Sequence, residues 1–122
     1  MQLKPLDYDF SVCKAADYSQ VNWASEFCFT GKTDQEHSLV CLTRDVPANV
    51  TERSDGWRAF RIEGVLDFSL VGILARLSGL LAEHGIGLFA ISTFNTDYIL
   101  VKQADYRPVL ALLESNGYKL LR

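Results

Sequence analysis

Long apolar runs are scarce in this chain of 122 residues. The longest, residues 70–81, is interrupted by Gly72, Arg76, Ser78 and Gly79, so it falls short of the roughly 20 apolar residues that a membrane-spanning helix needs. The N-terminal residues also lack the apolar core of a signal peptide. These absences predict a cytoplasmic protein with no membrane partner.

Cysteine and histidine are few and scattered. The cysteines Cys13, Cys28 and Cys41 are odd in number and widely spaced, which argues against a disulfide framework. No Cys-X-X-Cys pair is present, and His37 and His84 lie far apart, so neither a zinc site nor a cofactor is expected. Each cysteine falls in an apolar or alternating run, and we interpret all three as small buried hydrophobic residues. Nothing local supports a nucleophilic cysteine paired with His37.

Clustered positive charge is also missing. The 12 Lys and Arg residues are scattered among 15 Asp and Glu residues, the net charge is −3, and the sequence pI is about 5.3. A nucleic-acid partner is therefore not expected, because such binding relies on a basic face. With 48% hydrophobic and 22% charged residues the composition is that of an ordinary globular protein. A chain of this length buries roughly two-thirds of its unfolded surface without a metal or disulfide.

The first half of the sequence is rich in strand patterns and short of helix. Residues 8–13, 26–30 and 38–43 alternate or carry aromatic and β-branched side chains, which predicts three strands. Pro47 and the polar residues 49–56 predict a connection after the third strand.

In the second half, strand patterns and helix patterns alternate more clearly. Residues 57–65 alternate as a strand does, and Ser69 is a candidate N-cap for a helix that Gly85 would end. The apolar stripe of that helix has helical spacing, at Leu70, Ile73, Leu74, Leu77, Leu80 and Leu81.

Two apolar runs and a second helix follow. Residues 86–92 and 98–101 predict a β-hairpin, and Asp105 is a candidate N-cap for a helix that ends at Asn116-Gly117. Residues 118–121 predict a last strand. The order over residues 57–122 is βαββαβ, which indicates an α+β, ferredoxin-like unit with two helices on one face of a four-stranded antiparallel sheet.

The corner of the predicted hairpin has an unusual composition. Thr93, Asn95, Thr96 and Asp97 suit a tight turn, because their side chains hydrogen-bond their own backbone. An ordinary tight turn does not require an aromatic residue such as Phe94 at its centre. An aromatic ring, two hydroxyls and a carboxylate in one corner would suit a small zwitterion. The alternative is an ordinary hairpin whose Phe94 folds back onto the core.

The second half resembles an ACT domain, and more closely the CASTOR-type ACT domains of small bacterial proteins and cytosolic arginine sensors. The resemblance is carried by residues 66–74, 81–86 and, most specifically, 91–101. The first half looks like the degenerate ACT-like half that precedes the regular one, through the sequence motifs at residues 27–30, 36–41 and 46–47. The resemblance implies a degenerate half at residues 1–54 and an ACT domain at residues 55–122.

The resemblance implies a ligand site between ACT modules. Family ligands are amino acids that lie near the first βα loop, here Phe68, Ser69, Val71 and Gly72, and near the facing hairpin corner, here Thr93, Phe94, Asn95 and Asp97. Gly72 would let a carboxylate approach free N–H groups at the helix start. Thr93 would supply a hydroxyl or backbone contact, Phe94 an apolar wall, and Asp97 an anchor for an ammonium or guanidinium group.

Each of these residues also has a structural interpretation. Asp97 would cap the hairpin by accepting hydrogen bonds from backbone N–H groups. Gly72 would permit close packing of helix on sheet. Ser69 would act as a helix cap rather than as a ligand contact.

The resulting functional hypothesis is a non-catalytic regulatory or sensor module that binds a small amino acid or related metabolite as a homodimer. One alternative is a scaffold without ligand, whose exposed sheet edge pairs with another chain. A second is an acylphosphatase-like enzyme, since acylphosphatases share the ferredoxin-like unit. That alternative is weak, because Arg76 is expected about two turns into its helix, away from a phosphate loop at Gly64 and Val65. No catalytic triad or pair of carboxylates is visible.

Overall fold

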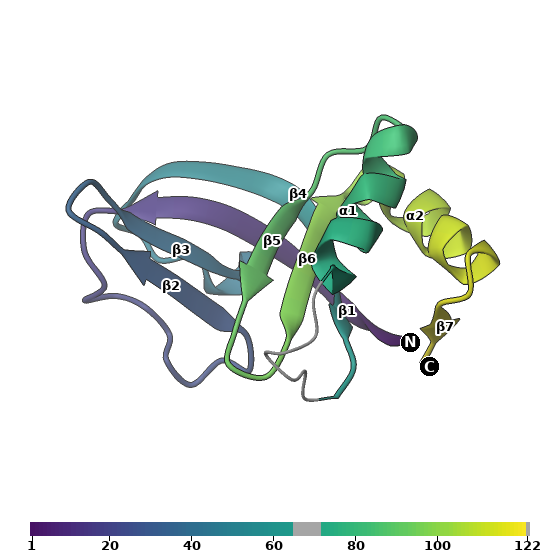
Figure 1. Ribbon diagram of the computed structural model, residues 1–122. Helices are drawn as coiled ribbons and strands as arrows, with labels where there is room; N and C mark the ends of the chain where they lie inside the picture. Colours follow the sequence, from purple (N-terminus) through teal and green to yellow (C-terminus); the bar gives the residue numbers. More distant parts are fainter. Residues whose placement is uncertain (65–71, 122) are drawn as a thin grey trace. The chain divides into compact units, whose positions relative to one another are not determined.

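The computed structural model describes residues 1–64 and 72–121 (Figure 1). These residues form two compact units. Residues Tyr8–Trp57 make up one, here called the strand unit, and Met1–Asp7 together with Arg58–Arg122 make up the other, here called the helical unit. No helix in the described part of the chain has the length and apolarity needed to cross a membrane.

The strand unit contains the strands predicted for the first half. The middle strand β3 pairs antiparallel with both of its neighbours, so that Cys41 of β3 lies opposite Cys28 on one side and Ser11 on the other. One cluster of buried residues in this unit contains Cys13, Leu39 and Cys41. The elements of this unit are β1 (Gln2–Ala15), which begins in the helical unit, β2 (Cys28–Lys32), β3 (His37–Leu42), the 3-10 helix η1 (Thr43–Asp45) and the first part of β4 (Val50–Ile62).

The prediction of a connection at residues 49–56 is wrong, because β4 begins at Val50. Most side chains at residues 50–55 are exposed, so the segment lacks the apolar alternation that marks a strand in the sequence. Its place beside β1 in the sheet supplies the backbone partners instead. Gly56 adopts a positive φ of 83°, a conformation open to glycine, and lets the chain turn within the strand.

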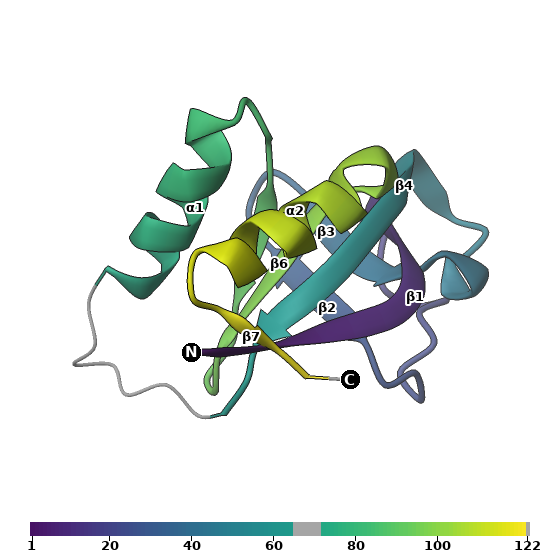
Figure 2. The ribbon, with the colours of Figure 1, turned by 90° about the vertical axis from the view of Figure 1, so that its right-hand side faces the viewer.

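The helical unit places two helices on one face of its strands (Figures 1 and 2). Buried apolar side chains from both helices and the strands form its core, with Leu3, Phe60, Leu77, Val101 and Leu113 among the residues with no exposed surface. The elements of this unit, beyond the ends of β1 and β4, are α1 (Ile73–Glu83), β5 (Phe89–Ser92), β6 (Asp97–Lys102), α2 (Gln103–Ser115) and β7 (Lys119–Leu120).

The last strand, β7, pairs with a different strand from the one that the βαββαβ pattern predicts. In the sheet, β4 lies between β1 and β6, β5 follows β6, and β7 pairs in parallel with the start of β1. Lys119 N–H donates to the Met1 carbonyl oxygen at 2.9 Å, and Leu121 N–H donates to that of Leu3 at 2.8 Å. The fold is therefore mixed α+β with two helices, but residues 57–122 do not complete the sheet alone. The assignment of residues 1–54 as a degenerate ACT-like half stays a prediction.

The helix ends differ in detail from the predicted caps. Helix α2 begins at Gln103 with Lys102 as N-cap, so Asp105 lies in the first turn, where a carboxylate interacts favourably with the helix dipole. The predicted cap Ser69 lies outside the described residues. Gly85 follows α1 with a φ of 68°, which confirms it as the residue that ends this helix.

The hydroxyl of Thr96 makes a buried hydrogen bond that ties the β5–β6 hairpin to β4. It donates to the Ile62 carbonyl oxygen at 2.7 Å. We expect Thr96→Val to lower the free energy of unfolding by about 1–3 kcal/mol, because the substitution keeps the shape and removes the donor. Urea unfolding measures this loss. Thr51→Val, which removes an exposed hydroxyl bonded to the Lys14 carbonyl oxygen, is the control and should cost less; equal losses would contradict the prediction.

The cysteines should differ in reactivity according to burial. Burial raises the pKa of all three thiols, to about 12 for Cys41, and keeps them protonated. Cys28 is half-buried, whereas Cys13 and Cys41 are buried. With a thiol-specific chromogenic disulfide at pH 8, we expect Cys28 to react first and Cys41 only after unfolding. A Cys28→Ala variant with an unchanged fast phase would refute this order.

Candidate functional site

The predicted corner is a closed turn between β5 and β6. Thr93 N–H donates to the Thr96 carbonyl oxygen at 2.8 Å, and the Thr93 hydroxyl donates to the same oxygen at 2.9 Å. Thr96 N–H donates in return to the Thr93 hydroxyl oxygen at 3.3 Å. The proton of the Thr93 hydroxyl is thus engaged within the turn, so this residue would meet a ligand as an acceptor rather than as a donor.

Asp97 faces Ser92 across the first residue pair of the hairpin. Its Oδ1 accepts a hydrogen bond from the Ser92 hydroxyl at 2.6 Å. The cap that the sequence suggested, with backbone N–H groups donating to Asp97, is not found among the described hydrogen bonds. Asp97 is half-buried, so its carboxylate is held by Ser92 and still reaches solvent.

Phe94 projects from the centre of the turn with 79% of its surface exposed. The alternative in which Phe94 folds back onto the core is therefore wrong. Asn95 beside it is exposed as well, whereas Thr96 is only 6% exposed and is anchored to Ile62. The hydrogen bond from Thr96 to Ile62 thus anchors the corner to β4, and the ring of Phe94 and the amide side chain of Asn95 are exposed to solvent.

Gly72 is the N-cap of α1 and adopts a φ of 79°. A Cβ atom built at this position would meet no atom of residues 1–64 and 72–121 within 4 Å, so close packing against the described sheet is not the reason for glycine here. The positive φ is the reason, because side chains strain this conformation. Arg76 N–H donates to the Gly72 carbonyl oxygen at 2.9 Å, and the N–H groups before it have no partner within the helix.

Only part of the predicted site is within the described residues. Phe68, Ser69 and Val71 lie outside them. Thr93, Phe94, Asn95 and Asp97 share one corner. The start of α1 and the turn between β5 and β6 lie toward the same end of the helical unit in both views (Figures 1 and 2).

The helical face of this unit carries a groove that the sequence did not predict. A cleft of about 140 Å³ at the start of α1 and a larger one of about 370 Å³ along it share Arg76, Asn116 and Tyr118, and we call them together the α1 groove. Arg76 lies in the first turn of α1, not two turns in, because the helix begins at Ile73. The seven-residue spacing of Arg76 and Glu83 is the sequence signal that points to a shared helix face.

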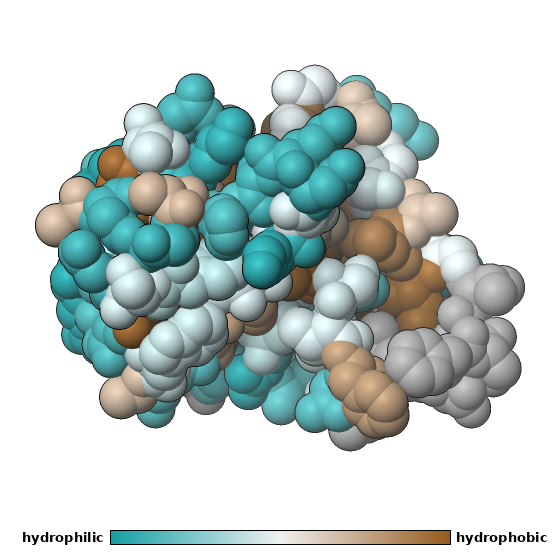
Figure 3. Space-filling view, turned by 90° about the vertical axis from the view of Figure 1, so that its left-hand side faces the viewer, coloured by the Kyte–Doolittle hydropathy of each residue, from teal (hydrophilic) through white to brown (hydrophobic). Residues whose placement is uncertain are grey.

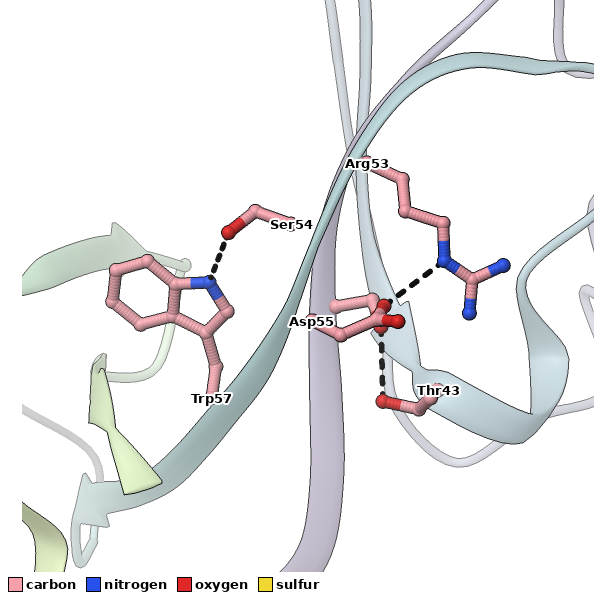
Figure 4. Close-up of polar contacts among 6 residues, drawn as sticks. Thr43, Arg53, Ser54, Asp55 and Trp57 are labelled. Carbon is pink, nitrogen blue, oxygen red and sulfur yellow. Dashed lines mark hydrogen bonds and ion pairs between the residues drawn. The ribbon is translucent and has the colours of Figure 1, made fainter. Parts of the chain in front are cut away.

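The strand unit holds a polar cluster around Ser11 that the sequence did not reveal (Figure 4). The fully buried Ser11 hydroxyl donates to Asp55 Oδ1 at 2.6 Å and lies 2.9 Å from the Thr43 hydroxyl. Arg53 Nε donates to the same Asp55 oxygen at 3.0 Å. The hydrogen bonds from Ser11 and then Arg53 lower the pKa of the Asp55 carboxyl. These partners satisfy the buried hydroxyl, so the cluster has a structural role.

The described residues show neither a nucleophilic cysteine–histidine pair nor a metal site. His37 contacts the Tyr18 ring at 5.2 Å between centroids, and Cys41 has a pKa of about 12, so the nucleophilic pairing is unsupported. Within residues 1–64 and 72–121 no three His, Cys, Asp or Glu side chains are placed to hold a metal ion. Hydrophilic residues cover most of the face in Figure 3.

Comparison with solved structures gives the same fold in other proteins. A protein from Agobacterium tumefaciens is 31% identical, with a TM-score of 0.85 over 98% of this chain and 91% of that chain. A protein of unknown function from Vibrio cholerae is 21% identical, with a TM-score of 0.72 over 93% of this chain and 88% of that chain. Its identity is low enough that the likeness shows the fold alone.

An allosteric enzyme also contains this fold as one of its parts. Aspartate kinase from Clostridium acetobutylicum is 11% identical and matches 93% of this chain but 33% of its own length, with a TM-score of 0.65. No curated protein matches the sequence. A family model for the ACT domain matches residues 52–115, which is more than half of the sequence. This chain therefore belongs to the ACT domain family, whose members are regulatory modules that bind small ligands.

Proposed function

We propose that this protein is a non-catalytic sensor that binds a small amino acid or a related metabolite. The exposed ring of Phe94, on a corner anchored by the buried Thr96–Ile62 hydrogen bond, is the observation that supports this function most directly. An exposed aromatic side chain at the tip of a fixed turn would gain further burial if a ligand packed over it.

The ligand would lie between the start of α1 and the β5–β6 corner. Its carboxylate would accept hydrogen bonds from the free N–H groups after Gly72, in the field of the helix dipole. Its ammonium group would bind Asp97, whose Oδ1 is oriented by Ser92. Phe94 would cover the aliphatic part of the ligand, with Thr93 and Asn95 as polar contacts. The resemblance assigns Phe68, Ser69 and Val71 to the same site.

The finer identity follows the same resemblance. We infer a cytoplasmic, CASTOR-type protein in which residues 1–54 are the degenerate half and residues 55–122 the ligand-binding half. A homodimer would complete the site, since family ligands lie between ACT modules, and the strand β5 offers an edge for pairing. Ligand binding would act by favouring one arrangement of the modules over another.

A thermal-shift screen against the twenty common amino acids tests the ligand class. A ligand at 100 times its Kd adds about 2.7 kcal/mol of stability, which raises the melting temperature by several degrees. We expect Asp97→Asn to remove the shift that wild type shows, because the ammonium loses its counter-charge. Asp34→Asn, an exposed position in the strand unit, is the matched control. A flat screen with a folded dimer would favour the scaffold function instead.

Phe94→Ala separates a ligand contact from a role in folding. Because the ring is 79% exposed, its removal should change the free energy of unfolding by about 0.5 kcal/mol or less without ligand. The ligand-induced shift should fall markedly. Trp23→Ala, which removes a 61% exposed ring from the strand unit, should leave the ligand shift intact. An unchanged ligand response in Phe94→Ala would remove the ring from the site.

A further inference from the structure

The α1 groove is a second candidate site, and it does not depend on the β5–β6 corner. Its larger part has a volume of about 370 Å³, within the range of small-molecule pockets. One wall is the exposed face of α1, and the other is the turn from α2 into β7. The residues of that part are Ala75, Arg76, Gly79, Leu80, Glu83, Asn116 and Tyr118.

Gly79 occupies the centre of the α1 wall, and nothing in the described part of the chain requires a glycine there. Its φ lies outside the positive range that favours glycine, and a Cβ atom there would meet no atom of the described residues within 4 Å. Glycine inside a helix costs roughly 1 kcal/mol relative to alanine. Neither conformation nor packing therefore accounts for it, whereas a molecule that lies against the helix backbone would.

Arg76 and Glu83 place opposite charges at the two ends of this wall. Both side chains are exposed, and neither forms an ion pair with another described residue. They are two helical turns apart, so their Cα atoms are separated by roughly 10 Å and the side chains do not pair with each other. The groove thus offers one cation and one anion with an apolar interval between them.

The wall opposite α1 is held in place by its own hydrogen bonds. The side-chain nitrogen of Asn116 donates to the Leu112 carbonyl oxygen at 2.8 Å, and Tyr118 N–H donates to that of Leu113 at 3.1 Å. Gly117 between them adopts a φ of 95°, which turns the chain sharply. Tyr118 thereby stays against the groove as an aromatic surface.

We propose that the α1 groove binds a short ω-amino acid, with its carboxylate on the Arg76 guanidinium and its ammonium on Glu83. The aliphatic chain lies over Gly79 and Leu80 and against Tyr118. The Cα atoms of the two residues lie roughly 10 Å apart, so a ligand that contacts both charges while its chain lies along the helix needs charged groups separated by several bonds, on the order of three methylene groups. An α-amino acid carries both charged groups on one carbon and matches this spacing less well.

Titration of the full chain with 4-aminobutyrate, followed by amide NMR, tests this site. We expect saturable shifts at Gly79 and Gly117, about tenfold weaker binding of butyrate and of butylamine, and no bridging by glycine. Binding should weaken as salt is added, because both charged side chains are exposed. Equal affinity for butyrate and 4-aminobutyrate, or no shift at all, would overturn the proposal.

Variants with matched controls locate the contacts. Arg76→Gln and Glu83→Gln should each weaken 4-aminobutyrate binding by about tenfold, whereas Arg107→Gln and Glu114→Gln on exposed positions of α2 should not. Gly79→Leu should abolish binding while the melting temperature stays at or above that of wild type, because leucine favours helix and fills the groove.

The corner and the groove are distinguished by one further variant. Asp97→Asn, which would remove the proposed corner ligand, should leave 4-aminobutyrate binding unchanged. If Gly79→Leu instead converts an oligomer to a monomer and 4-aminobutyrate has no effect, the groove is a contact between copies of this chain and the proposal is wrong.

Discussion

The helical unit depends on residues Met1–Asp7, which include the start of strand β1 and are far from the rest of the unit along the chain. Leu3 is fully buried in its core, although the whole strand unit separates Asp7 from Arg58 along the chain. The Gln2 carbonyl oxygen accepts from Glu63 N–H at 2.9 Å, and the Met1 carbonyl oxygen accepts from Lys119 N–H at 2.9 Å. Without this strand, β7 would lose its pairing partner and one side of the core would be uncovered. The two units therefore cannot fold as modules that each come from one continuous stretch of sequence.

Both candidate sites rest on parts of this unit whose polar groups are satisfied internally. Thr96 and Tyr106 use their hydroxyls on the carbonyl oxygens of Ile62 and Ala59, which ties the hairpin and α2 to β4. Backbone anchored in this way presents exposed groups in fixed positions, and a preorganised site loses less entropy when a ligand binds. The corner and the α1 groove therefore combine rigid support with exposed polar, charged and aromatic side chains.

Sequence patterns located the corner but not the behaviour of its side chains. The mixture of hydroxyls, carboxylate and aromatic ring at residues 93–97 was visible, whereas the engagement of the Thr93 hydroxyl by Thr96 was not. The exposure of Phe94 was one of two open alternatives, because a hydrophobic residue in a turn is compatible with both. The groove was not predicted, because Gly79 is an interruption of an apolar run in the sequence and Arg76 was considered only as such an interruption and as a phosphate-loop residue.

The sequence by itself determined the helices, the hairpin and the strand-rich first half, because local periodicity, turn residues and glycines act within a few residues. It also carried the ACT resemblance, through short motifs in the second half. Only the tertiary structure decided that β7 pairs with β1, that the polar residues 50–55 form a strand, and that α1 faces Asn116 and Tyr118 across a groove. These features join residues far apart in the chain, and no local pattern encodes which distant partner supplies a hydrogen bond.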